Sequence, residues 1–270
     1  MSAYRDLFKG TAPFYARYRP GYPDAMIASV VERFSLDGTG RLLDLGCGTG
    51  QLLLPLAPQF KTAIGMDPEP EMLAEATRVA DEAGITNAVW LEGGSLDLER
   101  LRNQIEPLRL TTIGRAFHWM DGDATLCALG SMTVDGGGVV QCGEPCEIWN
   151  GQRDWQIAVR EVIQRWLGEA RRAGSGTYAA NSDRVPWSEG DILSRSPFSR
   201  FEVQTIAYTR QLDIDGIVGY LYSMSFASPP VLGERCAGFE RDLRETLAAL
   251  SSDGVFEEDL VLDTYLAWKA

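Results

Sequence analysis

Short apolar runs alternate along the first half of the chain with segments in which apolar residues recur every three or four positions. A short apolar run favours a buried strand, whereas the longer spacing favours one face of a helix. Predicted strands cover residues 41–45, 61–66, 87–91, 110–113 and 138–142. Repeated units of a strand followed by a helix are typical of a parallel sheet with helices on both faces.

Two helices are predicted in or before this region. Residues 24–34 carry apolar side chains at helical spacing, and Asp24 after Pro23 can cap the first turn. The segment after Asp67 predicts a second helix that ends at Gly84, because glycine readily takes the backbone conformation that terminates a helix.

The pattern changes after Gly143. Apolar residues from Trp155 to Leu167 form a helical stripe, and the polar, glycine-containing stretch RRAGSGTYAANSD follows it, so we interpret residues 144–199 as an insertion. The rest of the chain predicts a strand at 201–208, a helix after Asp215, a helix over 234–250 and a last strand within 260–269.

Composition allows a sizeable core, since 45% of the residues are hydrophobic and 23% are charged. The 38 acidic residues outnumber the 25 basic ones, which gives a formal net charge of −13. This excess opposes the phosphate attraction that most nucleic-acid binders use, so we expect no nucleic-acid partner. The oligomeric state stays open.

Cysteine and histidine usage argues against structural zinc and a disulfide framework. The five cysteines are scattered without a CxxC pair, and His118 is the only histidine, so we expect no metal. The first twenty residues lack an apolar core segment, and no apolar run reaches the length of a membrane span. We therefore expect a cytoplasmic protein with no membrane partner.

The glycine-rich segment 46–50, GCGTG, follows the first predicted strand and precedes a helix-like stretch. Glycines let the backbone approach a ligand, and the start of a helix offers unpaired amides, so this turn indicates a nucleotide-type cofactor. Asp67 lies 21 residues after Gly46, at the end of the second strand. A carboxylate there can accept hydrogen bonds from both ribose hydroxyls of an adenosine.

Four segments resemble the class I S-adenosylmethionine (SAM)-dependent methyltransferases, especially the ubiquinone-biosynthesis and trans-aconitate methyltransferase-like groups. They are LLDLGCGTGQLLLPLA, GMDPEPEMLAEA, EGGSLDL and GRAFHWMD. The resemblance implies an α/β fold with a Rossmann-like, seven-stranded, mostly parallel sheet, helices on both faces and an inserted helical lid. It also implies SAM as cofactor and S-adenosylhomocysteine as product.

We expect a single domain over residues 1–270. Its parts are an N-terminal cap (1–34), a cofactor-binding half (35–143), the lid insertion (144–199), and a C-terminal part of sheet and helices (200–270).

Site residues follow from the resemblance position by position. Asp44 and Gly46 would border the methionine part of SAM, Asp67 would hold the ribose, and Ser95 with Leu96 would meet the adenine. Further cofactor contacts are assigned to Gly48, Gly50, Pro68, Met72, Arg115 and Ala116. The family often has an acid where this chain has Gly94, and Asp97 nearby is a candidate replacement.

The segment FYARYRPGYP resembles the N-terminal portion of these enzymes, in which an aromatic and a basic residue close over the cofactor. Tyr15 and Arg19 are the candidates here. A guanidinium can donate two parallel hydrogen bonds to the cofactor carboxylate. The alternative is that Arg19 pairs with a surface acid.

Methyl transfer is a direct displacement at a sulfonium carbon, so alignment of the two reactants supplies much of the rate. His118 is the candidate general base, because only its ordinary pKa lies near neutrality, although it can equally pack under the lid or orient a loop. Phe117, Trp119 and Trp149 are candidate acceptor contacts. Asp121 or Asp123 is expected to cap the following helix.

The favoured function is methyl transfer from SAM to an O, N or C atom of a small-molecule acceptor, plausibly a secondary metabolite. One alternative is a protein of the same fold that binds SAM without methyl transfer, as a cyclase or a binding module. A nicotinamide-dependent oxidoreductase is opposed by the GxGxG spacing, which differs from the dinucleotide GxGxxG.

Overall fold

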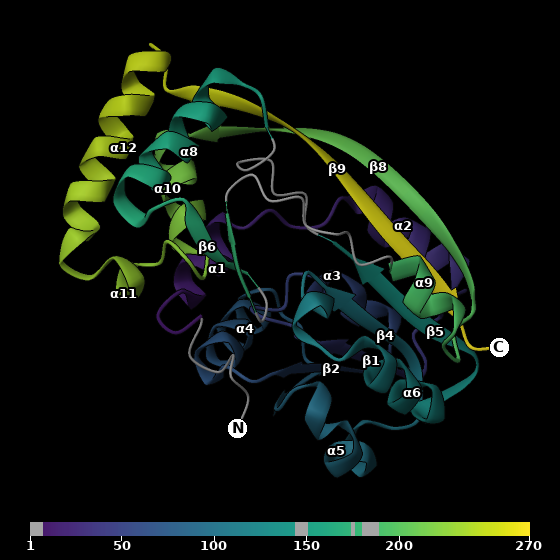
Figure 1. Cartoon of the computed structure of the whole chain (residues 1–270). Coiled ribbons are helices and arrows are strands. Elements are labelled where there is room, and N and C mark those ends of the chain that lie inside the picture. The colour runs from purple at the N-terminus through teal and green to yellow at the C-terminus, as the bar shows by residue number, and fades with distance from the viewer. Residues whose placement is uncertain (1–7, 144–150, 174–175, 180–188) are drawn as a thin grey trace.

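The computed structural model describes residues 8–143, 151–173, 176–179 and 189–270. Seven strands form one sheet in the order β3-β2-β1-β4-β5-β9-β8 (Figure 1). Neighbouring strands from β3 to β5 are parallel, whereas β9 is antiparallel to both β5 and β8. The expected seven-stranded, mostly parallel α/β sheet is therefore confirmed.

The sheet strands are β1 (Arg41–Leu45), β2 (Thr62–Asp67), β3 (Ala88–Glu92), β4 (Leu108–Gly114), β5 (Thr133–Cys142), β8 (Arg200–Asp213) and β9 (Val255–Trp268). A separate hairpin consists of β6 (Ala170–Ala173) and β7 (Gly176–Ala179). The helices are α1 (Ala12–Tyr18), α2 (Asp24–Arg33), α3 (Leu53–Leu56), α4 (Pro70–Glu82), α5 (Leu98–Ile105), α6 (Gly122–Met132), α8 (Asp154–Leu167), α9 (Glu189–Ser194), α10 (Ile214–Tyr222), α11 (Pro229–Leu232) and α12 (Cys236–Leu250).

Helices cover both faces of the sheet. One face packs against α2 and α3 through buried residues that include Met26, Val30 and Leu53. The other face packs against α5, α6 and α9 through a second core that includes Leu101 and Leu126. The central strands β1, β2 and β4 are buried on both sides, which explains why they appear in the sequence as continuous apolar runs.

A third core lies away from the sheet, in a helical cap made of α1, α8, α10 and α12 (Figure 1). Only α8 comes from the segment predicted as the lid, residues 144–199. The helices α10 and α12 come from the segment between β8 and β9, which the sequence assigned to the C-terminal part. The cap is thus assembled from three distant parts of the chain.

The cap is connected to the sheet by a long antiparallel pair. β8 and β9 pair over their full lengths, from Arg200 opposite Trp268 to Asp213 opposite Val255. β5 pairs only with residues 264–268 of β9. Residues 205–213 and 255–263 therefore form a two-stranded arm that extends beyond the sheet and ends at the cap (Figure 1).

Several local expectations change in the structure. Pro23, not Asp24, occupies the N-cap of α2, and Asp24 lies in its first turn. Asp121 caps α6 by accepting a hydrogen bond from the amide of Ala124, as expected, whereas Asp123 pairs with Arg195. Among the described helices, none has the length and apolar character needed to cross a membrane.

Candidate functional site

The turn after β1 requires its glycines. Gly46, Gly48 and Gly50 all have positive φ, of 74°, 52° and 82°. A Cβ at Gly46 would lie 2.6 Å from the Cβ of Ala116, so a larger residue would displace the segment after β4. The amides of Gly46 and Cys47 both donate to the carbonyl of Met66, which joins the turn to the end of β2.

Asp67 is buried at the end of β2 and holds the same turn. Its Oδ2 accepts from the amide of Gly48 and its Oδ1 from the amide of Glu69, both at 2.9 Å. Burial raises the pKa of Asp67 to about 6, although these two hydrogen bonds act to lower it. A carboxylate has about four acceptor positions, so Asp67 retains positions for the hydroxyls of a ribose.

Asp44, in β1, is buried beside Asp67. The Thr112 hydroxyl donates to its Oδ1 at 2.7 Å, while its Oδ2 has no hydrogen-bond partner among the described residues. Burial raises the pKa of Asp44 to about 7, hydrogen bonding to Thr112 and to the backbone of Leu53 lowers it, and the charge of Asp67 raises it. A buried carboxylate with one unused oxygen fits a cationic ligand group such as the ammonium of SAM.

The segment after β4 folds against the N-terminal part of the chain. Arg115 is buried with a φ of +57°, and its guanidinium donates to the carbonyl of Pro20 at 2.8 Å. The same guanidinium lies 4.6 Å from the ring centroid of Tyr22, whose hydroxyl sits against Gly114. Arg115 thereby fixes the N-terminal segment over the end of β4.

The candidate acceptor residues lie in the turn Phe117–Trp119. His118 is exposed and contacts Trp119, with ring centroids 4.8 Å apart. Phe117 is buried in the core beneath α6 and α9, so its side chain supports the turn from below. Trp149 lies outside the described residues. His118 is therefore accessible to an acceptor, whereas the side chain of Phe117 is not.

Tyr15 lies against the glycine turn, since a Cβ at Gly48 would be 3.5 Å from its ring. The Arg19 guanidinium is 4.9 Å from the centroid of Tyr15 and 5.3 Å from that of Tyr220 in α10. Its Nε also donates to the Ser223 hydroxyl at 3.0 Å. Arg19 thus connects the cofactor side to the cap, and its contact with the cofactor carboxylate stays a prediction.

The candidate adenine contacts lie at the start of the segment after β3. Leu96 is 84% exposed and Ser95 is half-buried. The Asp97 carboxylate accepts from the amide of Gly94 at 3.0 Å and pairs with Arg100 at 2.8 Å, so it is already engaged. Met72 is buried in α4 and Pro68 is half-buried at the end of β2.

The sequence did not identify three residues that the structure places at this site: Gln51, Tyr22 and Thr112. Tyr22 belongs to the FYARYRPGYP segment, so that motif was a usable signal. Thr112 reaches Asp44 only because β1 and β4 are neighbours in the sheet. No local pattern encodes that contact.

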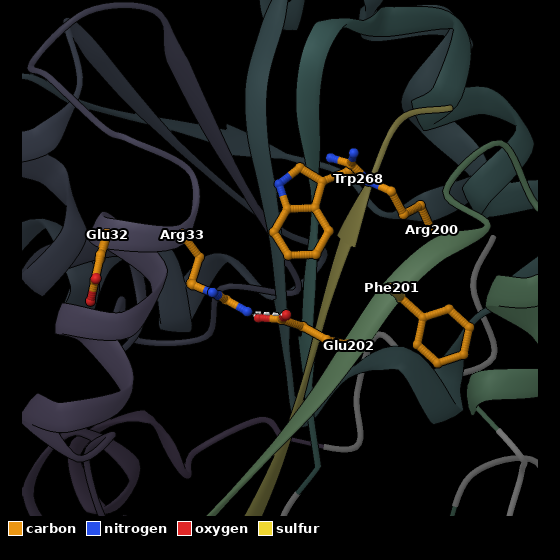
Figure 2. A pocket seen from close by; sticks show the side chains of 6 residues that line it. All are labelled: Glu32, Arg33, Arg200, Phe201, Glu202 and Trp268. Carbon is orange, nitrogen blue, oxygen red and sulfur yellow. Dashed lines mark hydrogen bonds and ion pairs between the residues drawn. The ribbon is translucent and has the colours of Figure 1, made fainter.

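A separate pocket of about 470 Å³ lies near the start of β8, between β8 and α2 (Figure 2). Figure 2 shows its lining side chains, Glu32, Arg33, Arg200, Phe201, Glu202 and Trp268. Trp268 pairs with Gly138 at the start of the core part of β5, remote from the carboxyl ends of the parallel strands. Ligands of such sheets bind beyond the carboxyl ends, so this pocket is not part of the cofactor site.

Comparison with known proteins agrees with this geometry. Residues 42–137 match the family model described as a methyltransferase domain. This part of the chain is therefore a methyltransferase domain. The cofactor of this methyltransferase is therefore SAM, and the nicotinamide-dependent reading of the glycine turn is wrong. No comparison tests the predicted subgroup.

Two curated relatives each match part of this chain. The probable S-adenosylmethionine-dependent methyltransferase CRG1 of Saccharomyces cerevisiae is 29% identical over 106 residues, or 39% of this chain and 35% of the yeast protein. The 23S rRNA (uracil(1939)-C(5))-methyltransferase RlmD of Francisella tularensis subsp. novicida is 37% identical over 62 residues. That match covers 23% of this chain and 14% of RlmD. The chain thus spans well under two thirds of either relative.

Among solved structures, a putative type II methyltransferase from Anaeromyxobacter dehalogenans is similar with a TM-score of 0.62 and 18% identity. The match covers 93% of this chain and 98% of the other. At this identity the similarity supports the fold, including its second half, and leaves the substrate undefined.

Proposed function

We propose that this methyltransferase transfers a methyl group from SAM to an O, N or C atom of a small-molecule acceptor. The observation that supports this most is the pair of buried carboxylates, Asp44 and Asp67, beside a turn whose three glycines all have positive φ. Asp67 has acceptor positions for a ribose, and the unused Oδ2 of Asp44 suits an ammonium.

The cofactor, when bound, supplies an electrophilic methyl group on a sulfonium, so direct displacement needs alignment more than a protein nucleophile. Gly46, Gly48 and Gly50 let the backbone approach it, and Tyr15 limits access of water from above. His118 is exposed beside this region and can accept a proton from a hydroxyl or ammonium acceptor. For an acceptor with no proton to lose, the same residue is dispensable.

The acidic composition favours a small molecule over a nucleic acid, because net negative charge repels phosphates. RlmD is named as acting on rRNA, so the relatives do not decide between a small-molecule and a nucleic-acid acceptor. A role in secondary metabolism and a cytoplasmic location belong to the same proposal.

Calorimetric titration with S-adenosylhomocysteine tests the cofactor site. Asp67→Ala is expected to weaken binding about tenfold or more, because the ribose hydroxyls lose a charged acceptor. Asp135→Ala, an exposed residue in β5, is the matched control and is expected to bind as wild type. Unchanged affinity in a folded Asp67→Ala variant would contradict the assignment.

Release of S-adenosylhomocysteine over a panel of small molecules and RNA oligonucleotides tests the reaction. Turnover with a small molecule supports the proposal. Binding of SAM with no release over the whole panel favours the alternative of a SAM-binding module or cyclase. Turnover with RNA alone overturns the choice of acceptor class.

A further inference from the structure

Helix α1 packs on α10 of the cap and also contacts the cofactor turn. On one side, the ring of Tyr15 covers Gly48. On the other, Phe14 and Tyr18 pack into the cap core, where Phe14 meets Tyr222 edge to face at 5.2 Å. A single short helix therefore contacts both parts of the site.

Gln51 attaches the end of this helix to the cofactor turn. It follows Gly50 directly, and its Nε2 donates to the carbonyls of Tyr15 at 3.3 Å and Arg19 at 3.1 Å. The Tyr15 carbonyl also accepts the Arg19 amide within the helix, whereas the Arg19 carbonyl lies just past the end of α1. Gln51 thus joins the glycine turn to the last turn of α1 by two hydrogen bonds.

Gly219 attaches the other side of the helix to the cap. It is buried within α10, and the ring of Tyr18 lies where a Cβ at this position would be. Glycine is among the poorest helix-forming residues, so its presence inside α10 has a packing reason. The close approach of Tyr18 is that reason.

Contacts before the helix attach it further to the cofactor domain. The amide of Gly10 donates to the Glu71 carboxylate at 2.6 Å, at the start of α4. Phe8 packs edge to face on Trp119 at 6.1 Å, beside His118. The α1 segment consequently touches α4, the glycine turn, the predicted acceptor turn and the cap.

We propose that Gln51 is a positioning residue through which cofactor binding sets the position of the cap, with α1 as the coupling element. This inference rests on the proposed function, since it assigns regulation to the same site. A cofactor that orders the turn also orders α1, and α1 then holds α10 in place for the acceptor. Coupling between two sites is reciprocal in free energy, so an acceptor under the cap must raise the affinity for the cofactor by the same factor.

The test uses the full chain and S-adenosylhomocysteine alone. In wild type, the ligand is expected to slow hydrogen exchange in α10 by about tenfold, although α10 does not contribute to the glycine turn. Gln51→Met keeps the length of the side chain and removes both hydrogen bonds. It is expected to reduce the α10 protection to less than about twofold and to speed ligand dissociation about tenfold.

Gln211→Met, on the outward face of β8, is the matched control and is expected to match wild type in both measurements. Gly219→Ala disturbs the coupling at the cap, where α10 contacts α1. Gly219→Ala is expected to speed ligand dissociation, because the new Cβ displaces Tyr18. The double variant Gly219→Ala with Tyr18→Ala is expected to remove that clash without restoring the coupling.

The possible failures are distinguishable. No binding of S-adenosylhomocysteine by wild type contradicts the proposed function. Binding without protection of α10, or equal dissociation rates for wild type and both Gln51→Met and Gly219→Ala, overturns the inference. A Gln51→Met chain that does not fold leaves Gly219→Ala to decide, since its substitution lies outside the turn.

Discussion

Asp44 and Asp67 are two carboxylates buried close together, and neither has a cation beside it among the described residues. Burial penalises the charged form, so both acids hold their protons at a pH where an exposed acid is ionised. A ligand that brings a positive charge or several hydroxyl donors relieves that penalty. Relief of this burial penalty at Asp44 and Asp67 therefore contributes to the free energy of cofactor binding.

This arrangement predicts that cofactor affinity rises with pH. With folded pKa values of about 7 for Asp44 and about 6 for Asp67, protons must leave before the carboxylates bind ligand well. Affinity for S-adenosylhomocysteine is expected to increase from pH 5 to pH 8, by up to about tenfold per unit for each proton released. Calorimetry across this range checks it, and a flat profile contradicts it.

The same shifts predict a cost in the stability of the ligand-free protein. The folded pKa of Asp44 lies above the ordinary value of 3.8. Its favourable contribution to the free energy of unfolding is therefore complete below about pH 4 and is lost as pH rises through 7. Asp44→Asn cannot ionise. The difference in unfolding free energy between Asp44→Asn and wild type is expected to grow between pH 4 and 8, as measured by urea denaturation.

His118 supports a kinetic prediction. Because it is exposed next to the end of β4, it can reach an acceptor without a change in the core. If the acceptor loses a proton, His118→Ala is expected to slow single-turnover methyl transfer by roughly a hundredfold, with cofactor affinity nearly unchanged. If the His118→Ala variant keeps the wild-type rate from pH 6 to 9, His118 has only a structural role in its turn.

At the level of elements, the sequence predicted every strand of the sheet, with bounds in error mainly for β5, β8 and β9. These errors have a common cause, because the missed parts of β5, β8 and β9 are rich in polar residues or glycine and so lack an apolar run. The helix after the glycine turn is only Leu53–Leu56, since Pro55 and Pro58 limit it. Helix α1 and the hairpin β6–β7 were not predicted, because elements of seven and four residues are too short for an apolar pattern to repeat.

The candidate site was predicted less completely than the fold. The glycine turn and Asp67 are adjacent to strand ends and carry a local signal, so they were found. Gln51 binding to carbonyls of α1, and Thr112 binding to Asp44 across 68 residues, depend on tertiary contacts. No pattern of spacing contains such contacts.

For α1, we predict ordering by the cofactor. Terminal segments are mobile unless they are tied down, and the bonds from Gln51 and Arg115 hold residues 10–22 partly to the turns that border the cofactor site. Hydrogen exchange in residues 10–22 is expected to slow when S-adenosylhomocysteine is added. Equal exchange with and without the ligand would show that the segment is held independently of it.

At the level of the whole molecule, the arm of β8 and β9 is the main connection between the sheet and the cap. Its inner face carries a buried ion pair between Arg210 and Glu258, with side chains 15% and 1% exposed. Removing one partner leaves a buried charge, so Glu258→Ala is expected to cost roughly 3 kcal/mol of unfolding free energy. The double variant Arg210→Met with Glu258→Leu is expected to recover most of this loss, as measured by chemical denaturation.

The arm also shows how the segment between β8 and β9 can change without a change in the sheet. Asp213 and Val255 are paired across the arm, so the 41 residues between them leave and re-enter the sheet at adjacent positions. Such a segment can be exchanged for another of different length without altering the register of a single strand. The cofactor half of the molecule can then stay constant while the segment between the two strands varies.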